Sequence, residues 1–255
     1  MTQPDPAENA AKPATGPRGG PGGGRPGADG PRYFVTYTFY RIQNKFRRLD
    51  ANSRLTASHD FRQHLDDWSK KIQVHAYSTA GMRPDVDFLL WRIAPDLESL
   101  HDMALATKKT AFGVHLTIPH SYLAMTRRSV YVDKHQHEGQ EGSRLYIRPT
   151  ESKYLFVYPF VKTHDWYQLP MADRQKAMDE HIAMGHKYPS VRINTTYCFG
   201  LDDPEFVVAF ESDQPGDFLD LVMEMRSSRA RPYTLRDTPI FTCIRKSFQE
   251  LCEEF

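Results

Sequence analysis

Two distant stretches of the chain resemble each other, and an internal repeat limits the fold more strongly than any other feature. The segment YFVTYTF at 33–39 can be set above YLFVYPF at 154–160, which matches Tyr37 with Tyr158. Chance similarity between two aromatic strands is the alternative interpretation. The aligned tyrosines favour a duplication, in which each half of the chain repeats one order of secondary structure.

A second pair of segments keeps the same order. DVDFLL at 85–90 resembles DPEFVV at 203–208, and a helical pattern begins several residues after each. Within these helical patterns, Leu100 and Phe218 lie at the same distance beyond the phenylalanines of the two segments.

Each half is therefore predicted to run strand, helix, strand, strand, helix, strand. The predicted elements of the first half are 33–42, 57–71, 72–79, 86–94, 96–111 and 120–128. Those of the second half are 153–162, 167–187, 190–199, 205–212, 215–228 and 239–246. This βαββαβ order is the ferredoxin-like unit. We predict an α+β fold in which two such units lay their sheets together, with helices on the outside.

The composition of two segments places them outside the repeated halves. Residues 1–31 hold seven prolines and eight glycines without an aromatic residue, so they cannot bury enough surface to offset their ordering entropy. We predict a disordered tail over 1–31. The polar stretch 129–152, rich in His, Glu, Gln and Gly, is predicted to connect the halves 32–128 and 153–255.

The charge and the cysteines exclude several classes of partner. A formal net charge of +1 gives no field for nucleic acid or acidic membranes, and no stretch approaches the ~20 apolar residues that span a bilayer. Three scattered cysteines provide neither a disulfide framework nor zinc-ligand spacing. We expect a cytoplasmic protein that has no transmembrane segment and no nucleic-acid partner.

One histidine lies on the apolar face of the longest helical pattern of the second half. Met178, His181, Ile182 and Gly185 follow the i, i+3, i+4, i+7 spacing, so His181 is predicted to face the core. A buried histidine satisfied by a backbone carbonyl is one interpretation. The other is an axial iron ligand, since neutral imidazole is the common proximal ligand of haem.

The strand before this helix carries the other reactive groups. Tyr158 alternates with Phe156 and Phe160, so all three side chains project from one face, and Lys162 shares that face. A packed tyrosine and a solvated strand-end lysine are the ordinary interpretations. A phenol near a strong oxidant could instead be oxidised, and a lysine there could bind a propionate of a porphyrin.

The second half resembles the chlorite dismutase-like haem superfamily. The resemblance rests on three motifs, YPFVKTHDWYQLP at 158–170, DEHIAMGHKYP at 179–189 and VRINTTYCFGLDD at 191–203. It is specific over about 150–246 and mainly architectural over 33–128. It implies a dimeric α+β barrel made of duplicated ferredoxin-like units, often assembled as a homopentamer.

Within this superfamily the chain is most similar to coproheme decarboxylases of the actinobacterial type. Chlorite-degrading members carry an arginine where Ile193 stands and an aliphatic residue where Tyr158 stands. The resemblance implies that iron coproporphyrin III (coproheme) binds with His181 on the iron and is converted to haem b with hydrogen peroxide. It assigns catalysis to Tyr158 and Lys162.

The resemblance also implies the residues that surround the porphyrin. Trp166, Phe160, His186 and Ile193 would line its site together with Lys162, and His137 in the connector is a weak candidate for the distal base. The alternatives are a chlorite dismutase or haem peroxidase of the same fold, and a haem-binding protein without turnover.

Overall fold

The computed structural model describes residues 31–131 and 147–255. Almost all of the predicted tail and most of the predicted connector, including His135 and His137, lie outside the described residues. Among the helices of the described ranges, none is both long and apolar enough to cross a membrane.

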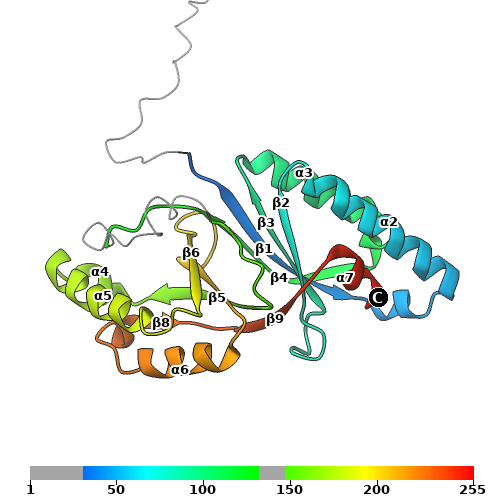
Figure 1. Cartoon of the computed structure of the whole chain (residues 1–255). Coiled ribbons are helices and arrows are strands. Elements are labelled where there is room, and N and C mark those ends of the chain that lie inside the picture. The colour runs from blue at the N-terminus through cyan, green and yellow to red at the C-terminus, as the bar shows by residue number, and fades with distance from the viewer. Residues whose placement is uncertain (1–30, 132–146) are drawn as a thin grey trace, which may run out of the picture. The chain divides into compact units, whose positions relative to one another are not determined.

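The described elements follow the predicted order in both halves (Figure 1). The first half contains β1 (Phe34–Ile42), α2 (Ala51–Ser69), β2 (Gln73–Ser78), β3 (Phe88–Ala94), α3 (Leu97–Lys109) and β4 (Leu116–Met125). The second contains β5 (Tyr154–Lys162), α5 (Met171–Gly185), β6 (Arg192–Tyr197), β7 (Phe206–Ser212), α6 (Pro215–Met225) and β9 (Phe241–Lys246). Short elements absent from the prediction are α1 (Asn44–Arg47), η1 (Gly113–His115), α4 (His164–Gln168), η3 (Arg231–Tyr233), β8 (Thr234–Arg236) and α7 (Phe248–Glu253).

Two predicted helices differ from the observed ones at their N-terminal ends. Helix α2 begins at Ala51 rather than at 57, because the Asp50 carboxylate accepts a hydrogen bond from the Ser53 N–H at 3.0 Å and caps the helix there. The single helix predicted over 167–187 is wrong. Pro170 disfavours helical geometry at Leu169, which is extended, and the segment divides into α4 and α5.

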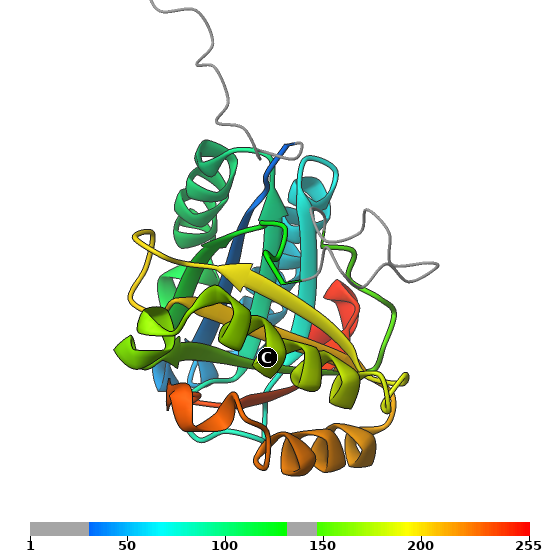
Figure 2. The same cartoon turned by 90° about the vertical axis from the view of Figure 1, so that its left-hand side faces the viewer.

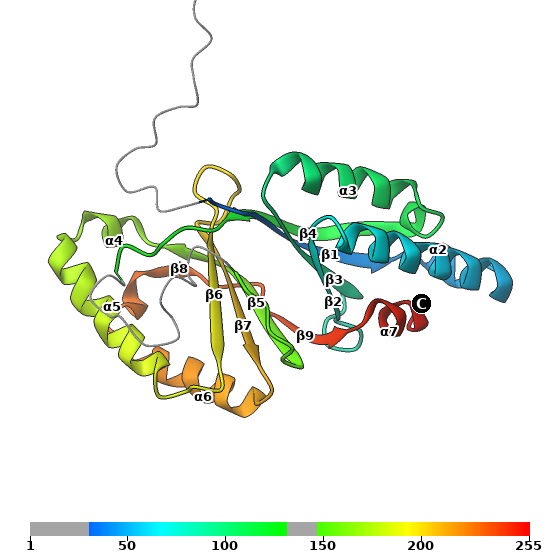
Figure 3. The same ribbon diagram turned by 45° about the horizontal axis from the view of Figure 1, so that its top comes forward.

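The strands form one closed antiparallel sheet, which confirms the predicted α+β fold. Within the first half the strand order is β4-β1-β3-β2, and within the second it is the equivalent β9-β5-β7-β6. The halves join through β2–β9 and β4–β6 pairing, so the sheet closes into a barrel. Helices α2 and α3 cover the outside of the first half, and α5 and α6 lie outside the second (Figures 1 and 3).

The register corrects the tyrosine alignment from which the repeat was inferred. Tyr37 pairs with Trp91 on β3, whereas the residue that pairs equivalently with β7 is Val157. The structural counterpart of Tyr158 is therefore Thr38. Because side chains alternate along a strand, this one-residue offset puts Tyr37 inside the barrel and Tyr158 outside it.

A different pair of residues does repeat between the halves. The carboxylate of Asp87, just before β3, accepts a hydrogen bond from the Ile42 N–H at the end of β1 at 2.6 Å. Glu205, just before β7, accepts one from the Lys162 N–H at the end of β5 at 2.7 Å. The duplication is therefore real, and its repeated contacts lie at the strand ends.

Aromatic side chains of the first half fill one side of the barrel interior. Tyr37, Trp91 and His75 form one row across β1, β3 and β2, with ring centroids 5.4 and 5.8 Å apart. Burial lowers the pKa of His75 to about 4, the charge of Arg245 lowers it further, and Glu151 opposes the shift. His75 is consequently neutral in the folded protein at neutral pH.

We expect His75 to destabilise the ligand-free protein in acid. The unfolded state binds a proton at His75 near pH 6.5, but the folded state does so only near pH 4. The free energy of unfolding therefore keeps the contribution of neutral His75 above pH 6.5 and loses it as the pH falls to about 4. This loss amounts to about 3 kcal/mol. His75→Phe should make the free energy of unfolding, measured by chemical denaturation, less dependent on pH in this window. His59→Gln, on the exposed face of α2, is the control, and an unchanged slope in the His75 variant would contradict the assignment.

Candidate functional site

The outward face of the second half carries the predicted tyrosine. Cross-strand register places Tyr158 of β5, Val208 of β7 and Thr195 of β6 in one row on this face. The neighbouring row holds Phe156, Phe210 and Ile193. The prediction that Tyr158 and Phe156 project from one face is confirmed, and the register puts Ile193 on that face as well.

This face is less covered than its counterpart in the first half. The row equivalent to Tyr158, Val208 and Thr195 consists of Thr38, Leu90 and Ala76, which are all buried beneath α2 and α3. In the second half Thr195 is exposed and Tyr158 is half-buried. Ile193 is 51% exposed, whereas its counterpart Val74 is 7% exposed. The exposure of Ile193 and Thr195 shows that part of this sheet face is left open by α5 and α6. The two helices are yellow-green and orange in Figure 2.

Helix α5 presents His181 toward this region. One turn earlier, Ala177 and Met178 pack in a cluster around the buried ring of Trp166. Burial lowers the pKa of His181 to about 4, and the positive charge of Lys162 lowers it further. The imidazole is neutral at neutral pH and makes no hydrogen bond or ion pair with the described residues. An added Cβ at Gly185, one turn later, would meet no atom within 4 Å.

Lys162 ends β5 and is partly buried among aromatic rings. Its Nζ lies 4.2 Å from the centroid of the Trp166 ring and 5.3 Å from that of Phe160, and it donates to the Ala230 carbonyl at 3.5 Å. Burial lowers the pKa of Lys162 to about 8, against the charge of Glu205. This lysine is not the solvated strand-end charge of the ordinary interpretation.

Tyr158 lies against an aromatic ring and within range of three charged side chains. Its ring stacks on Phe210 with a centroid separation of 5.8 Å. Burial raises the pKa of Tyr158, Asp237 raises it further, and the charges of Arg226 and Arg231 oppose this. The phenol therefore keeps its proton over the physiological range, which suits loss of a hydrogen atom better than loss of a proton alone.

The remaining predicted residues take different places. Phe160 is half-buried on the same face of β5 as Tyr158, and Trp166 is buried in α4. His186 is the exposed C-cap of α5, at the end of the helix that carries His181. The structure thus places Phe160, Trp166 and His181 near Lys162, and Tyr158 on the same face of β5. Ile193 lies two strands away in the neighbouring row, and His186 ends α5.

The sequence interpretation missed four residues near this face. Arg226, Arg231 and Asp237 act on the pKa of Tyr158. Thr195 could have been found by alternation from Ile193. Asp237 lies in the segment RDTPIF at 236–241, where the resemblance to the superfamily continues, but no role was assigned to it.

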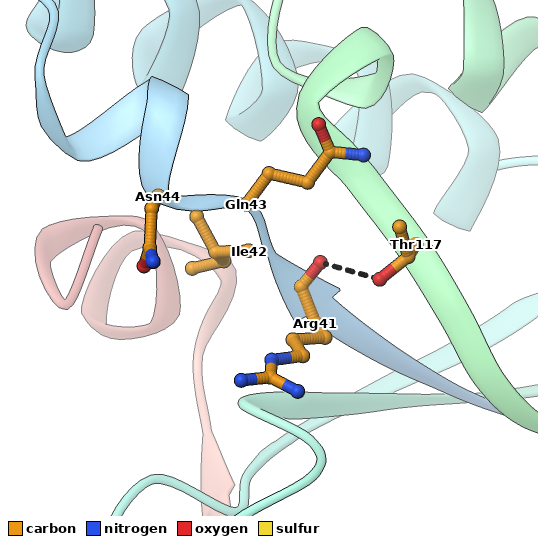
Figure 4. Close-up of a pocket in the computed structure, with 5 residues that line it drawn as sticks. All are labelled: Arg41, Ile42, Gln43, Asn44 and Thr117. Atoms are coloured by element: carbon orange, nitrogen blue, oxygen red, sulfur yellow. Dashed lines mark hydrogen bonds between the residues drawn. The ribbon is translucent and has the colours of Figure 1, made fainter.

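The hollow in Figure 4 is a separate feature of the first half. It lies where β1 leads into α1, and its lining residues are Arg41, Ile42, Gln43, Asn44 and Thr117. The Thr117 hydroxyl donates to the Arg41 carbonyl there. No predicted site residue lines this hollow.

The described residues fit an iron porphyrin better than a bare metal ion. Within the described ranges no group of three or more His, Cys, Asp or Glu side chains could hold a metal. A neutral imidazole that has no hydrogen-bond or ion-pair partner among the described residues, an open apolar face and cations at one edge are what a carboxylated macrocycle needs. His181 would provide the iron ligand, and Lys162 would face a carboxylate.

Comparisons with known proteins agree with this fold. A family model described as chlorite dismutase matches residues 54–246, more than half of the chain. The coproheme decarboxylase of Mycolicibacterium smegmatis is 32% identical over 176 residues, covering 69% of this chain and 74% of that protein. The coproheme decarboxylase of Staphylococcus carnosus is 28% identical over 210 residues, covering 76% and 84%.

A solved structure gives the same result for the fold. A mutant chlorite dismutase of Candidatus Nitrospira defluvii superposes with a TM-score of 0.79 at 22% identity, covering 87% of this chain and 94% of that one. Together with the family match and the 32% identical relative, this barrel makes the chain a member of the chlorite dismutase family.

Proposed function

We propose that this protein is a coproheme decarboxylase, which uses hydrogen peroxide to convert two propionates of iron coproporphyrin III into vinyl groups and yields haem b. The observation that carries the proposal is the shared outward face of β5. On it, Tyr158 and Lys162 lie four residues apart, and the charge of Lys162 acts on His181. The two relatives named coproheme decarboxylase support it.

The chemistry requires a two-electron oxidation of each side chain. One propionic acid group and one hydrogen peroxide give one vinyl group, one carbon dioxide and two water molecules. When bound, the iron porphyrin would supply the oxidising equivalents from peroxide. Tyr158 would give up its phenol hydrogen atom and regain one from the β-carbon of the propionate. The second electron leaves the substrate as the carboxylate departs as carbon dioxide.

Lys162 and His181 would position the porphyrin and its propionate. The ammonium of Lys162, on the same strand face as Tyr158, would bind the reacting propionate so that its β-carbon lies beside the phenol. His181 would hold the macrocycle against this face. Partial burial strengthens both interactions, because little water competes for the groups.

The direct test is the mass of the product. Purified protein is mixed with iron coproporphyrin III and then titrated with peroxide, and we expect two successive losses, each of one carbon dioxide and two hydrogens. An unchanged porphyrin mass after several equivalents of peroxide would reject the proposal.

Degradation of chlorite is the second candidate, because the matching family model is described as chlorite dismutase. Ile193 argues against it, since an exposed aliphatic side chain cannot hold an oxychlorine anion. Oxygen evolution from chlorite by the haem-loaded protein would favour this candidate over the decarboxylase.

We expect the affinity for ferric coproporphyrin to fall as the pH rises above about 8. The Lys162 ammonium, with its pKa lowered to about 8, is charged below that value and loses its proton above it, so its attraction for a carboxylate is lost. Affinity measured by absorbance titration should decrease about tenfold between pH 7 and pH 9. Lys162→Arg stays charged over this range and should remove most of the decrease. A wild-type decrease that persists undiminished in this variant would show that another group is responsible.

A further inference from the structure

Three arginines that follow α6, Arg226, Arg229 and Arg231, pair with carboxylates close to the proposed site. Arg226 and Arg231 each donate through Nη1 to the same oxygen of Asp237, at 2.8 and 2.5 Å. The third arginine, Arg229, pairs with Glu180 of α5 at 3.3 Å. Asp237 therefore holds two of these three arginines.

Asp237 is the most enclosed member of its group. Its side chain is 19% exposed, compared with 43% for Arg226 and 35% for Arg231. Burial acts to raise the pKa of Asp237, but the hydrogen bonds from Arg231 and Arg226 hold it below the ordinary value. The aspartate is ionised at neutral pH, and one negative charge faces two guanidinium groups.

The group also lies within electrostatic range of both proposed catalytic residues. The charges of Asp237, Arg226 and Arg231 all act on Tyr158, and the charge of Arg231 acts on Lys162. The chain places these groups together, because β8 pairs with the end of β5 through Val161 and Lys162, and Asp237 directly follows β8. With Lys162 and the neighbouring Glu205 included, three cations face two carboxylates, so this edge of the site keeps a net positive charge.

We propose that Asp237 occupies, in the empty protein, the place of one porphyrin carboxylate on Arg231 and Arg226, and that an incoming propionate displaces it. This inference rests on the proposed function and adds to it a control of the affinity for the substrate. Because the aspartate competes with the ligand, it weakens binding of every anion at this position. Only a porphyrin with a carboxylate at this position meets this competition, so Asp237 lowers the affinity for the four-carboxylate substrate and leaves the affinity for porphyrins without the reactive propionates unchanged.

The test compares two ferric porphyrins in the absence of peroxide, so that no turnover occurs. Iron coproporphyrin III carries four propionates, and iron deuteroporphyrin IX retains only the two that do not react. Asp237→Asn should bind coproporphyrin about tenfold more tightly, equivalent to about 1.4 kcal/mol, and deuteroporphyrin within about twofold of wild type. Arg231→Gln should weaken coproporphyrin binding alone. The gain in Asp237→Asn should shrink as salt is added.

Matched variants distinguish competition between Asp237 and the propionate from a purely structural role of Asp237. Asp237→Glu keeps the negative charge and should behave as wild type, and Glu180→Gln, which breaks the Arg229 pair, should change neither affinity. Weaker or unchanged coproporphyrin binding by Asp237→Asn, or equal changes for both porphyrins, would overturn the inference. Failure of the wild-type protein to decarboxylate coproporphyrin would reject the proposed function but not this inference, because this test measures only binding. Normal decarboxylation together with unchanged porphyrin binding by Asp237→Asn would reject this inference and leave the proposed function in place.

Discussion

Replacing Tyr158 by phenylalanine is expected to lower decarboxylation by about 10³-fold, equivalent to about 4 kcal/mol of activation free energy. Phenylalanine keeps the ring that stacks on Phe210 and removes only the hydroxyl. The affinity for ferric coproporphyrin should therefore stay within about twofold of wild type. Single-turnover mass analysis measures the first quantity, and absorbance titration without peroxide measures the second.

Tyr154→Phe is the matched control for this variant. Tyr154 lies on the same strand and the same outward face, four residues before Tyr158, and it packs in the same cluster. It is farther from Lys162, so its hydroxyl should not be needed. Equal loss of activity in both variants would indicate a packing effect, and full activity of Tyr158→Phe would remove the phenol from the mechanism and favour a haem-binding protein without turnover.

Local patterns were sufficient to predict the order of the elements. Alternation along β5 placed Tyr158 and Phe160 on one face, and helical spacing placed His181 on the partly covered face of α5. These predictions depend only on the period of the backbone, which tertiary contacts seldom change. The predicted order of the strands identified the ferredoxin-like units, and the register then confirmed their pairing.

The errors came from features that a local pattern does not encode. The alignment of Tyr37 with Tyr158 was offset by one residue, because two aromatic strands match almost equally well in adjacent registers and only the pairing with β3 and β7 decides between them. The open face of the second half was also beyond sequence reasoning. It depends on how far α5 and α6 cover β6, and that coverage is set by long-range packing.

The site is therefore best understood as an asymmetry between two duplicated halves. Both halves have the same rows of outward side chains. Helices α2 and α3 bury these rows in the first half, whereas Ile193 and Thr195 remain exposed in the second half. The packing of α2 and α3 on the sheet stabilises the first half, because it buries apolar surface. The second half gives up part of that stabilisation, and a flat apolar ligand would restore it on binding.

His181→Ala tests the other half of the proposed site and should have an effect at least as large as Tyr158→Phe. The substitution removes the neutral imidazole that would ligate the iron, so we expect the affinity for ferric coproporphyrin to fall on the order of 10²-fold and the absorbance spectrum of the bound porphyrin to change. Decarboxylation should be lost with it. Free imidazole can occupy the space left by the side chain, so its addition should restore the spectrum and part of the affinity.

His164→Ala provides the comparison, because His164 is an exposed histidine at the start of α4 and no role is assigned to it. Its spectrum and affinity should match those of the wild type. An unaltered spectrum in His181→Ala would mean that another group binds the iron. The porphyrin would then have to lie away from the Tyr158–Lys162 face, and the proposed geometry for hydrogen-atom transfer would be lost. Rescue by imidazole without recovery of turnover would show instead that the helix must hold the ligand rigidly, because a freely rotating imidazole cannot keep the propionate beside the phenol.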